Sequence, residues 1–416
     1  MVDDLPKASR ASLPLGEQPS APKSGHVAAL GVLLIFLRLG LTSFGGPVAH
    51  LGYFRREFVE RRKWLGEAAF ADLVALCQFL PGPASSQVGI ALGALRAGLP
   101  GAMAAWLGFT LPSAAIMIAF AYGLRLLPDM SAAGWLHGLK LAAVAVVAQA
   151  VWSMGRQFCR DRVRASFAIS AAVTVLLWTS AFVQMAVIGL GALLGWRLLS
   201  VRQADVAAHA DFRISKWIST LAWLLFLTLL TLLPLAADLS GSHALAEFGS
   251  FYHSGALVFG GGHVVLPLLR AQVVPTGWVS DGDFLAGYGM AQALPGPLFS
   301  FAAYLGAASS GNPHGWTGGL LALAAIFLPA FLLVLGALPH WNRWRTQPSL
   351  RAALDGINAA VVGILLAALY NPIFLSSVHG PLDLALVLTA FALLMYWKVS
   401  PFWVVAPAAL TGASLA

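Results

Sequence analysis

Charged residues are scarce in this chain of 416 residues: Asp, Glu, Lys and Arg make up 10% of it, against about 25% in an ordinary soluble domain. Hydrophobic residues make up 59%, and the mean hydropathy is +0.78. Such a composition cannot cover a water-facing surface, which excludes a soluble enzyme, a nucleic-acid-binding domain and a disordered tail protein. Cysteine is equally scarce: Cys77 and Cys159 make neither a disulfide framework nor a zinc site.

The apolar residues form long runs without the two-residue alternation of a transmembrane strand. Because a helix needs about 20 apolar residues to cross a bilayer, we predict an all-α, polytopic membrane protein with about 10 to 13 transmembrane segments. The run at 165–199 fits one tilted helix or two short ones, and both alternatives stay open. The net charge of +8 is typical of a membrane protein with basic cytoplasmic loops.

The chain contains an internal duplication. The motif Phe44-Gly45-Gly46-Pro47 recurs as Phe259-Gly260-Gly261-Gly262, and Gln78-Phe79-Leu80-Pro81-Gly82-Pro83 recurs as Gln292-Ala293-Leu294-Pro295-Gly296-Pro297. Further landmarks at a similar spacing are Trp64 with Trp278, Phe70 with Phe284, Leu111-Pro112 with Leu328-Pro329, and Gly138-Leu139-Lys140 with Gly356-Ile357-Asn358. Landmarks in the same order at a nearly constant offset predict two copies of one structural unit.

Loop charges indicate that the copies have opposite orientations. Residues 55–63 carry a net charge of +3, whereas their counterpart at 270–283 carries −1. Residues 156–164 again carry +3, whereas 371–383 contain only Asp383. Basic loops mark the cytoplasmic side of a membrane, so this reversal predicts inverted-topology repeats.

We divide the chain accordingly into a disordered leader at 1–25, a first repeat at 26–199, a linker with a connecting transmembrane segment at 200–240, and a second, inverted repeat at 241–416. Inversion needs an odd number of crossings between equivalent points. The apolar segment at 217–233 is able to supply that parity, although the threading of 165–237 stays open.

Each Pro-Gly-Pro motif breaks a helix inside an apolar run, because proline lacks an amide donor and excludes the helical conformation from the residue before it. Matching breaks in inverted halves are the strongest sequence indication of a transport site, and helix N-termini favour anions. Helix capping and close packing are the structural alternative. The predicted substrate-binding residues here are Gln78, Pro81, Gly82, Pro83, Ser85, Ser86 and Gln87, with Gln292, Pro295, Gly296, Pro297 and Ser300 in the second copy.

The glycine motifs are also candidates for substrate binding. Gly45, Gly46 and Gly260 to Gly262 can unwind a helix end and present backbone amides to a ligand, or can simply allow close packing. His263 follows the second motif and is either a proton acceptor or a hydrogen-bonding residue.

Rare charges inside apolar runs are functional candidates because burial in lipid is costly. Arg38, Arg96 and Lys140 are cationic and suit an anionic substrate, with Asn358 at the position equivalent to Lys140. Snorkelling of Arg96 and Lys140 to the interface is the alternative. Asp72 is an acidic candidate for ion coupling or for a salt bridge.

The first-half motifs resemble the signature of the bacterial chromate transporter family, in its two-domain, long-chain type. The matching runs are Ser43-Phe44-Gly45-Gly46-Pro47, Arg61-Arg62, Trp64, Cys77 to Gln87 and Gly108-Phe109-Thr110-Leu111-Pro112-Ser113. The likeness covers residues 27–415 and includes the motifs of the second half. It implies an inner-membrane carrier that expels chromate, uses the membrane gradient and confers chromate resistance; sulfate is a second substrate discussed for such proteins.

We therefore expect a secondary active oxyanion transporter, not an enzyme, with no cofactor or metal and no nucleic-acid partner. The substrate is expected between the two breaks, and one repeat is expected to rock against the other. The alternatives are an exchanger of sulfate or another oxyanion, a passive anion channel, and a membrane-embedded reductase, which the lack of a dinucleotide motif disfavours. Assembly as a homodimer stays open.

Overall fold

The structure is a computed structural model that describes residues 25–126, 134–178, 180–199, 215–259, 262–344 and 347–415. The described residues form helices and connecting turns, with no β-strand among them. Of the predicted units, the leader up to residue 24 and the first part of the linker, 200–214, lie outside the described residues.

The first copy consists of α1 (Gly25–Thr42), α2 (Gly46–Phe54), the π-helix η1 (Arg55–Arg61), α3 (Glu67–Phe79), α4 (Ala84–Leu126), α6 (Gly134–Phe158), α7 (Arg162–Leu177) and α8 (Ala181–Leu198). The additional helix α9 (Lys216–Ser240) connects it to the second copy. The second copy consists of α10 (His243–Ala256), η2 (Gly262–Val264), α11 (Val265–Val273), α12 (Asp281–Ala293), η3 (Leu298–Ser300), α13 (Phe301–Ala308), α14 (Gly315–Ala337), η4 (Leu338–His340), α15 (Trp341–Trp344), α16 (Pro348–Ala368), η5 (Leu369–Phe374), α17 (Pro381–Met395) and α18 (Phe402–Leu415).

Within the described ranges, five helical segments are long and apolar enough to cross a membrane: α4, α6, α9, α14 with η4, and α16 with η5. Five shorter apolar helices accompany them among the described residues. Helix α9 leaves large apolar side chains uncovered, with Trp217 85% and Leu239 80% exposed, and such side chains require lipid around them. The chain is a multi-pass helical membrane protein.

The ambiguous run at 165–199 forms two helices, α7 and α8. Ser180 lies between them and caps α8, because its hydroxyl accepts a hydrogen bond from the amide of Val183. A side-chain cap of this kind supplies a partner for an amide that has none within the helix.

Both copies contain a sharp helical hairpin. In the first, α4 reverses at Ala97 and Gly98, where Gly98 has a φ of 63°, so that Gly93 packs against the backbone of Gly101 with no room for a Cβ. In the second, Gly306 of α13 packs in the same way against Gly318 of α14. Equivalent residues thus make equivalent contacts, which confirms the two repeats.

The equivalent helices α4 and α14 pack side by side and run in opposite directions. The amide of Trp316, at the start of α14, donates to the hydroxyl of Tyr122 near the end of α4. Phe331, further along α14, contacts Trp106, which lies earlier in α4. Equivalent helices that run in opposite directions are typical of inverted-topology repeats.

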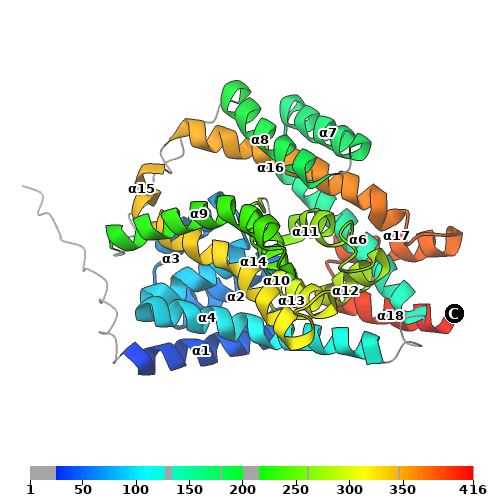
Figure 1. Ribbon diagram of the computed structural model, residues 1–416, viewed down its shortest axis with the longest axis horizontal. Helices are drawn as coiled ribbons and strands as arrows, with labels where there is room; N and C mark the ends of the chain where they lie inside the picture. The colour runs from blue at the N-terminus through cyan, green and yellow to red at the C-terminus, as the bar shows by residue number, and fades with distance from the viewer. Residues whose placement is uncertain are drawn as a thin grey trace, which may run out of the picture.

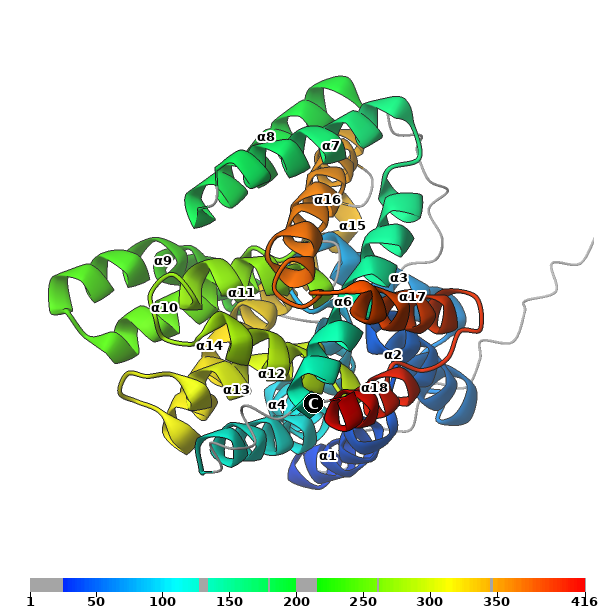
Figure 2. The same cartoon turned by 90° about the vertical axis from the view of Figure 1, so that its right-hand side faces the viewer.

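The C-terminal hairpins of the two copies are exchanged. The α7–α8 hairpin packs on α16 of the second copy, and α17–α18 packs on α6 of the first; Figures 1 and 2 show the first hairpin at the top against α16 and the second beside α6. Glycines bring the backbones together at both contacts: Gly191 meets Gly356, and Gly138 meets Ala408. Each central helix is therefore held by a hairpin from the other copy.

Candidate functional site

The two Pro-Gly-Pro motifs break helices as predicted. Helix α3 ends at Phe79 before the first motif, and α12 ends at Ala293 before the second. Gly82 and Gly296 have φ values of 118° and 97°, which only glycine adopts without strain. Helices α3 and α12 have 13 residues each and are about 20 Å long, so neither crosses a hydrocarbon core about 30 Å thick.

Each break is joined to the other copy by a backbone hydrogen bond. The amide of Gly82 donates to the carbonyl of Val258 over 2.7 Å, and the amide of Gly296 donates to the carbonyl of Ser43 over 3.0 Å. The two bonds are equivalent under the repeat. Both breaks therefore lie at the interface between the copies, and in this conformation two of the amides predicted to face an anion already have carbonyl partners.

The glycine motifs lie at the same interface. Gly45 and Gly46 have positive φ values of 101° and 76°, so the end of α1 is unwound as predicted. Pro47 lies next to Gly262, its own equivalent in the second copy, which places both near the axis that relates the repeats. Gly260 and Gly261 lie outside the described residues.

His50 connects the first break to the second copy and was not predicted from the sequence. It is 1% exposed; its Nδ1 lies 3.3 Å from the hydroxyl of Ser85, and its Nε2 lies 3.2 Å from the carbonyl oxygen of Ser43. A carbonyl only accepts, so Nε2 carries the hydrogen, and in the neutral ring Ser85 donates to Nδ1. Through Ser43 the network continues to the amide of Gly296.

Several buried polar atoms around the breaks have no hydrogen-bond partner. They include Ser43 Oγ, Ser86 Oγ, Gln87 Oε1, Thr110 Oγ1 and Gln292 Nε2. The amide nitrogen of Gln87, by contrast, donates to the carbonyl of Pro81 over 2.7 Å. Because an unpartnered buried polar group costs about 1–3 kcal/mol, these atoms are the candidates for contact with a ligand at this interface.

The second break has a less polar surrounding. Ser300 is buried, and Leu298 and Phe299 separate it from Pro297. His263 hydrogen-bonds through Nδ1 to the hydroxyl of Tyr288 over 2.8 Å. That tyrosine also interacts with the side chain of Gln292, so His263 and Gln292 belong to one cluster. Gln78, before the first break, is exposed.

The predicted cations are not gathered at the breaks. Arg38 is exposed on α1, and Arg96 is partly buried with its guanidinium 5.4 Å from the ring centroid of Trp64. Lys140 lies beside Gly282 at the start of α12. Asn358 on α16 and Asp72 on α3 are both partly buried.

Glu247 is a buried acid that the sequence reasoning missed. Its side chain is 1% exposed, its two carboxylate oxygens have no hydrogen-bond partner, and His243 lies 4.0 Å away. Because it stands near the start of the run at 243–269, it reads from the sequence as a residue at a helix end. The structure instead places it inside the packed bundle, one turn after His243.

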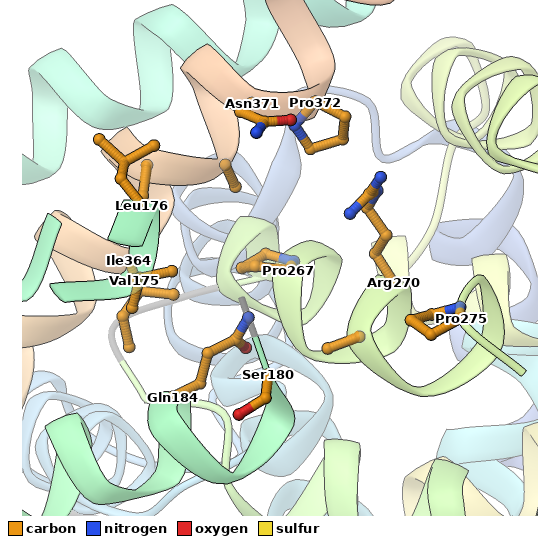
Figure 3. A pocket seen from close by; sticks show the side chains of 13 residues that line it. Val175, Leu176, Ser180, Gln184, Pro267, Arg270, Pro275, Ile364, Asn371 and Pro372 are labelled. Carbon is orange, nitrogen blue, oxygen red and sulfur yellow. The ribbon is translucent and has the colours of Figure 1, made fainter. Parts of the chain in front are cut away.

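A pocket lies apart from the breaks, between α7, α8, α11 and α16 (Figure 3). Gln184 and Arg270 extend beside it from α8 and α11, and Ser180 and Asn371 complete its polar lining. Arg270 also donates from Nε to Asp281 over 2.8 Å. The pocket contains none of the residues that the sequence predicted for substrate binding.

The basic loop after α2 is folded on itself by ion pairs. Arg55 donates to Glu60 over 2.8 Å and to Glu67 over 2.6 Å, and Glu57 accepts from Arg61 and Arg62. The hydrogen bond from Arg55 lowers the pKa of Glu67. These pairs leave the net positive charge of the loop unchanged and order it beside α3.

The sequence matches the Chromate transporter family twice, at residues 30–196 and 245–413. The Chromate transport protein of Cupriavidus metallidurans is 29% identical over 393 residues, which cover 92% of each chain. The Chromate transport protein of Pseudomonas aeruginosa is 28% identical over 373 residues, which cover 87% of this chain and 86% of that protein. No solved structure matches this chain.

Proposed function

Since the chain belongs to the chromate transporter family, we propose that it is a secondary active transporter that exports chromate across the inner membrane and confers chromate resistance. Membership of a transporter family supports the view that this protein moves its substrate across the membrane without changing it chemically. The observation that carries the proposal is the pair of equivalent hydrogen bonds, Gly82 to Val258 and Gly296 to Ser43, which joins each helix break to the other copy at the interface between inverted repeats.

The substrate is proposed to bind where these bonds now lie. In this conformation the carbonyl oxygens of Val258 and Ser43 each stand where an oxyanion oxygen would accept from the same amide. Separation of the copies at this interface frees both amides for the substrate. The unpartnered Ser86 hydroxyl adds a donor, so the donors converge on an anion.

His50 is proposed to supply the positive charge of the site. When its ring is protonated, Nδ1 becomes a donor to Ser85, and the hydroxyl of Ser85 is then free to donate to the oxyanion. Arg38 and Lys140 were the sequence candidates for this role, but their positions on the exposed side of α1 and beside α12 favour His50.

The membrane potential is sufficient to drive export. Each elementary charge that crosses the membrane is worth about 2.3 kcal/mol per 100 mV, so a dianion leaving a negative interior gains about 4.6 kcal/mol, which supports a gradient of about three orders of magnitude. A proton bound at His50 or Glu247 that crosses with the anion, or an exchanged sulfate, would change this stoichiometry.

The moving bodies are proposed to contain helices of both copies. The sequence suggested one repeat rocking against the other, but the exchange of α7–α8 and α17–α18 ties each central helix to the opposite copy. The hairpins therefore move with the helices on which they pack, while the breaks separate.

Chromate flux in everted vesicles tests this proposal. A membrane potential that is positive inside the vesicles, a proton gradient and a sulfate gradient are each imposed separately. The gradient that drives chromate uptake identifies the driving force. Accumulation of chromate against its gradient supports secondary transport, whereas flux that only dissipates a gradient supports a channel. Labels in loops 55–63 and 270–283 should be accessible from opposite sides, and labelling from one side would contradict inverted repeats.

A further inference from the structure

The two exchanged hairpins are each tied to their central helix by a cluster of three polar side chains. The arginine cluster consists of Asp161, Arg164 and Asp355, and the histidine cluster consists of His379, Asp383 and His137. Asp161 and His379 are 218 positions apart in the sequence, as are His137 and Asp355, and Arg164 and Asp383 are 219 apart. The clusters are therefore equivalent under the repeat.

The arginine cluster is a permanent ion pair between copies. Arg164 in the first turn of α7 donates to Asp355 of α16 over 2.6 Å and also pairs with Asp161, the cap of its own helix. One guanidinium thus lies between two carboxylates. The guanidinium of Arg164 stays positively charged, because arginine is not deprotonated in proteins.

The histidine cluster has the reverse pattern, with one carboxylate between two imidazoles. His137 Nε2 in the first turn of α6 lies 2.8 Å from Asp383 Oδ1 in the first turn of α17. His379 Nδ1 lies 4.0 Å from Asp383 Oδ2, and the centroids of the two imidazole rings are 5.7 Å apart with the ring planes tilted by 30°. The histidine cluster therefore joins the two copies, as the arginine cluster does. Its two outer groups are imidazoles, where the arginine cluster has carboxylates, and its central group is a carboxylate, where the arginine cluster has a guanidinium.

We propose that the histidine cluster binds one divalent transition-metal ion, of the zinc, cobalt or nickel type, through ring nitrogens of His137 and His379 and the carboxylate of Asp383. Two imidazoles and one carboxylate form a donor set that suits such ions, whereas Mg²⁺ and Ca²⁺ prefer oxygen donors. Three protein ligands leave at least one position for water, and the 66% exposed side chain of His379 leaves that side open.

The distances fit such an ion after small side-chain movements. The three donor atoms lie within 4.8 Å of one another. Ligand atoms about 2.0–2.1 Å from a tetrahedral metal are about 3.3–3.5 Å from one another. This separation lies between the 2.8 Å from His137 Nε2 to Asp383 Oδ1 and the upper limit of 4.8 Å for the three donor atoms. The bound ion would replace the hydrogen bond of His137 with two coordinate bonds and hold α6 against α17 more firmly.

The test uses the full-length protein, purified in detergent, freed of any affinity tag and stripped with a chelator. Cobalt(II) is titrated and followed by its visible absorption, and zinc is then added as a competitor. We expect one cobalt ion per chain in the wild type. We expect His379→Gln, which changes an exposed side chain, to weaken binding at least about tenfold, because even outer-shell partners of a metal site cost 10- to 100-fold.

His314→Gln is the matched control, since His314 is exposed and lies outside the cluster. Its affinity should equal that of the wild type, and elution volume and helicity should be the same for all three proteins. The proposal is overturned if His379→Gln binds cobalt as tightly as the wild type does. It is also overturned if the wild type binds no more cobalt than the double variant His137→Gln with His379→Gln. Because the measurement needs no chromate, its failure would leave the transport proposal untouched.

Discussion

Replacing His50 by glutamine tests the proposed role of this residue most directly. The Nε2 of glutamine can take the place of the His50 Nε2 and keep the bond to the Ser43 carbonyl, which now spans 3.2 Å. The bond to Ser85 is lost, and so is the ability to carry a positive charge. The variant therefore separates the structural contact from the proton.

The expected loss follows from one charge-assisted hydrogen bond. Such a bond contributes about 1.5–3 kcal/mol, so His50→Gln should weaken oxyanion binding by about 10- to 150-fold. The pH profile is the sharper measurement. If one proton on His50 accompanies each dianion, affinity in the wild type rises about tenfold for each pH unit of acidification while the free residue is neutral, and it is flat in the variant.

The assay is binding and flux of chromate at alkaline pH, where the anion stays doubly charged. His253→Gln is the matched control, because His253 bonds only the carbonyl of Gly249 in its own helix. An unchanged affinity and an unchanged pH slope in His50→Gln would refute the proposed network. A loss of affinity with the wild-type slope would show that His50 acts only as a hydrogen-bonding residue.

Three further changes probe other parts of the site. Pro81→Ala combined with Pro83→Ala should allow the helix to continue and abolish transport while membrane insertion is retained; normal chromate resistance of cells would contradict this. Ser86→Ala should stabilise the empty protein by up to about 1 kcal/mol, since its hydroxyl is buried without a partner, yet weaken substrate affinity about fivefold, and Ser300→Ala should change affinity less; equal effects on affinity would refute the asymmetry between the copies. Glu247→Gln should fold normally and lose any response of flux to a proton gradient, so an unchanged response in everted vesicles would exclude Glu247 from coupling.

The duplication made much of the fold predictable, because several of the glycine landmarks proved to be packing contacts. Gly138 and Gly356 were aligned only as equivalent positions, and both are places where a hairpin backbone approaches without room for a Cβ. The breaks at Gly82 and Gly296 followed from proline chemistry alone. What the alignment could not show is which central helix each hairpin contacts, because both copies present the same small residues.

The missed site residues share a different cause. His50 stands just after the run at 27–46, in the short helix α2, and a search of apolar runs for internal charges passes over a neutral histidine there. Its role depends on contacts with Ser85 and Ser43 that are made only when α2 folds against α4. The loop charges were more informative: the reversal between 156–164 and 371–383 has its physical counterpart in the replacement of Arg164 by Asp383 at equivalent positions.

The exchange of hairpins constrains how a substrate could pass. If each repeat moved as a rigid body, α7–α8 would have to slide over α16, where Gly191 and Gly356 bring the two backbones together, and the ion pair of Arg164 with Asp355 would have to break. In the proposed mechanism, opening at the breaks instead exchanges the bonds of Gly82 and Gly296 to carbonyls for bonds to the oxyanion. The proposed motion therefore keeps both hairpin interfaces intact and moves the tips of the broken helices, and a substrate that binds the freed amides would lower the energy of the open state.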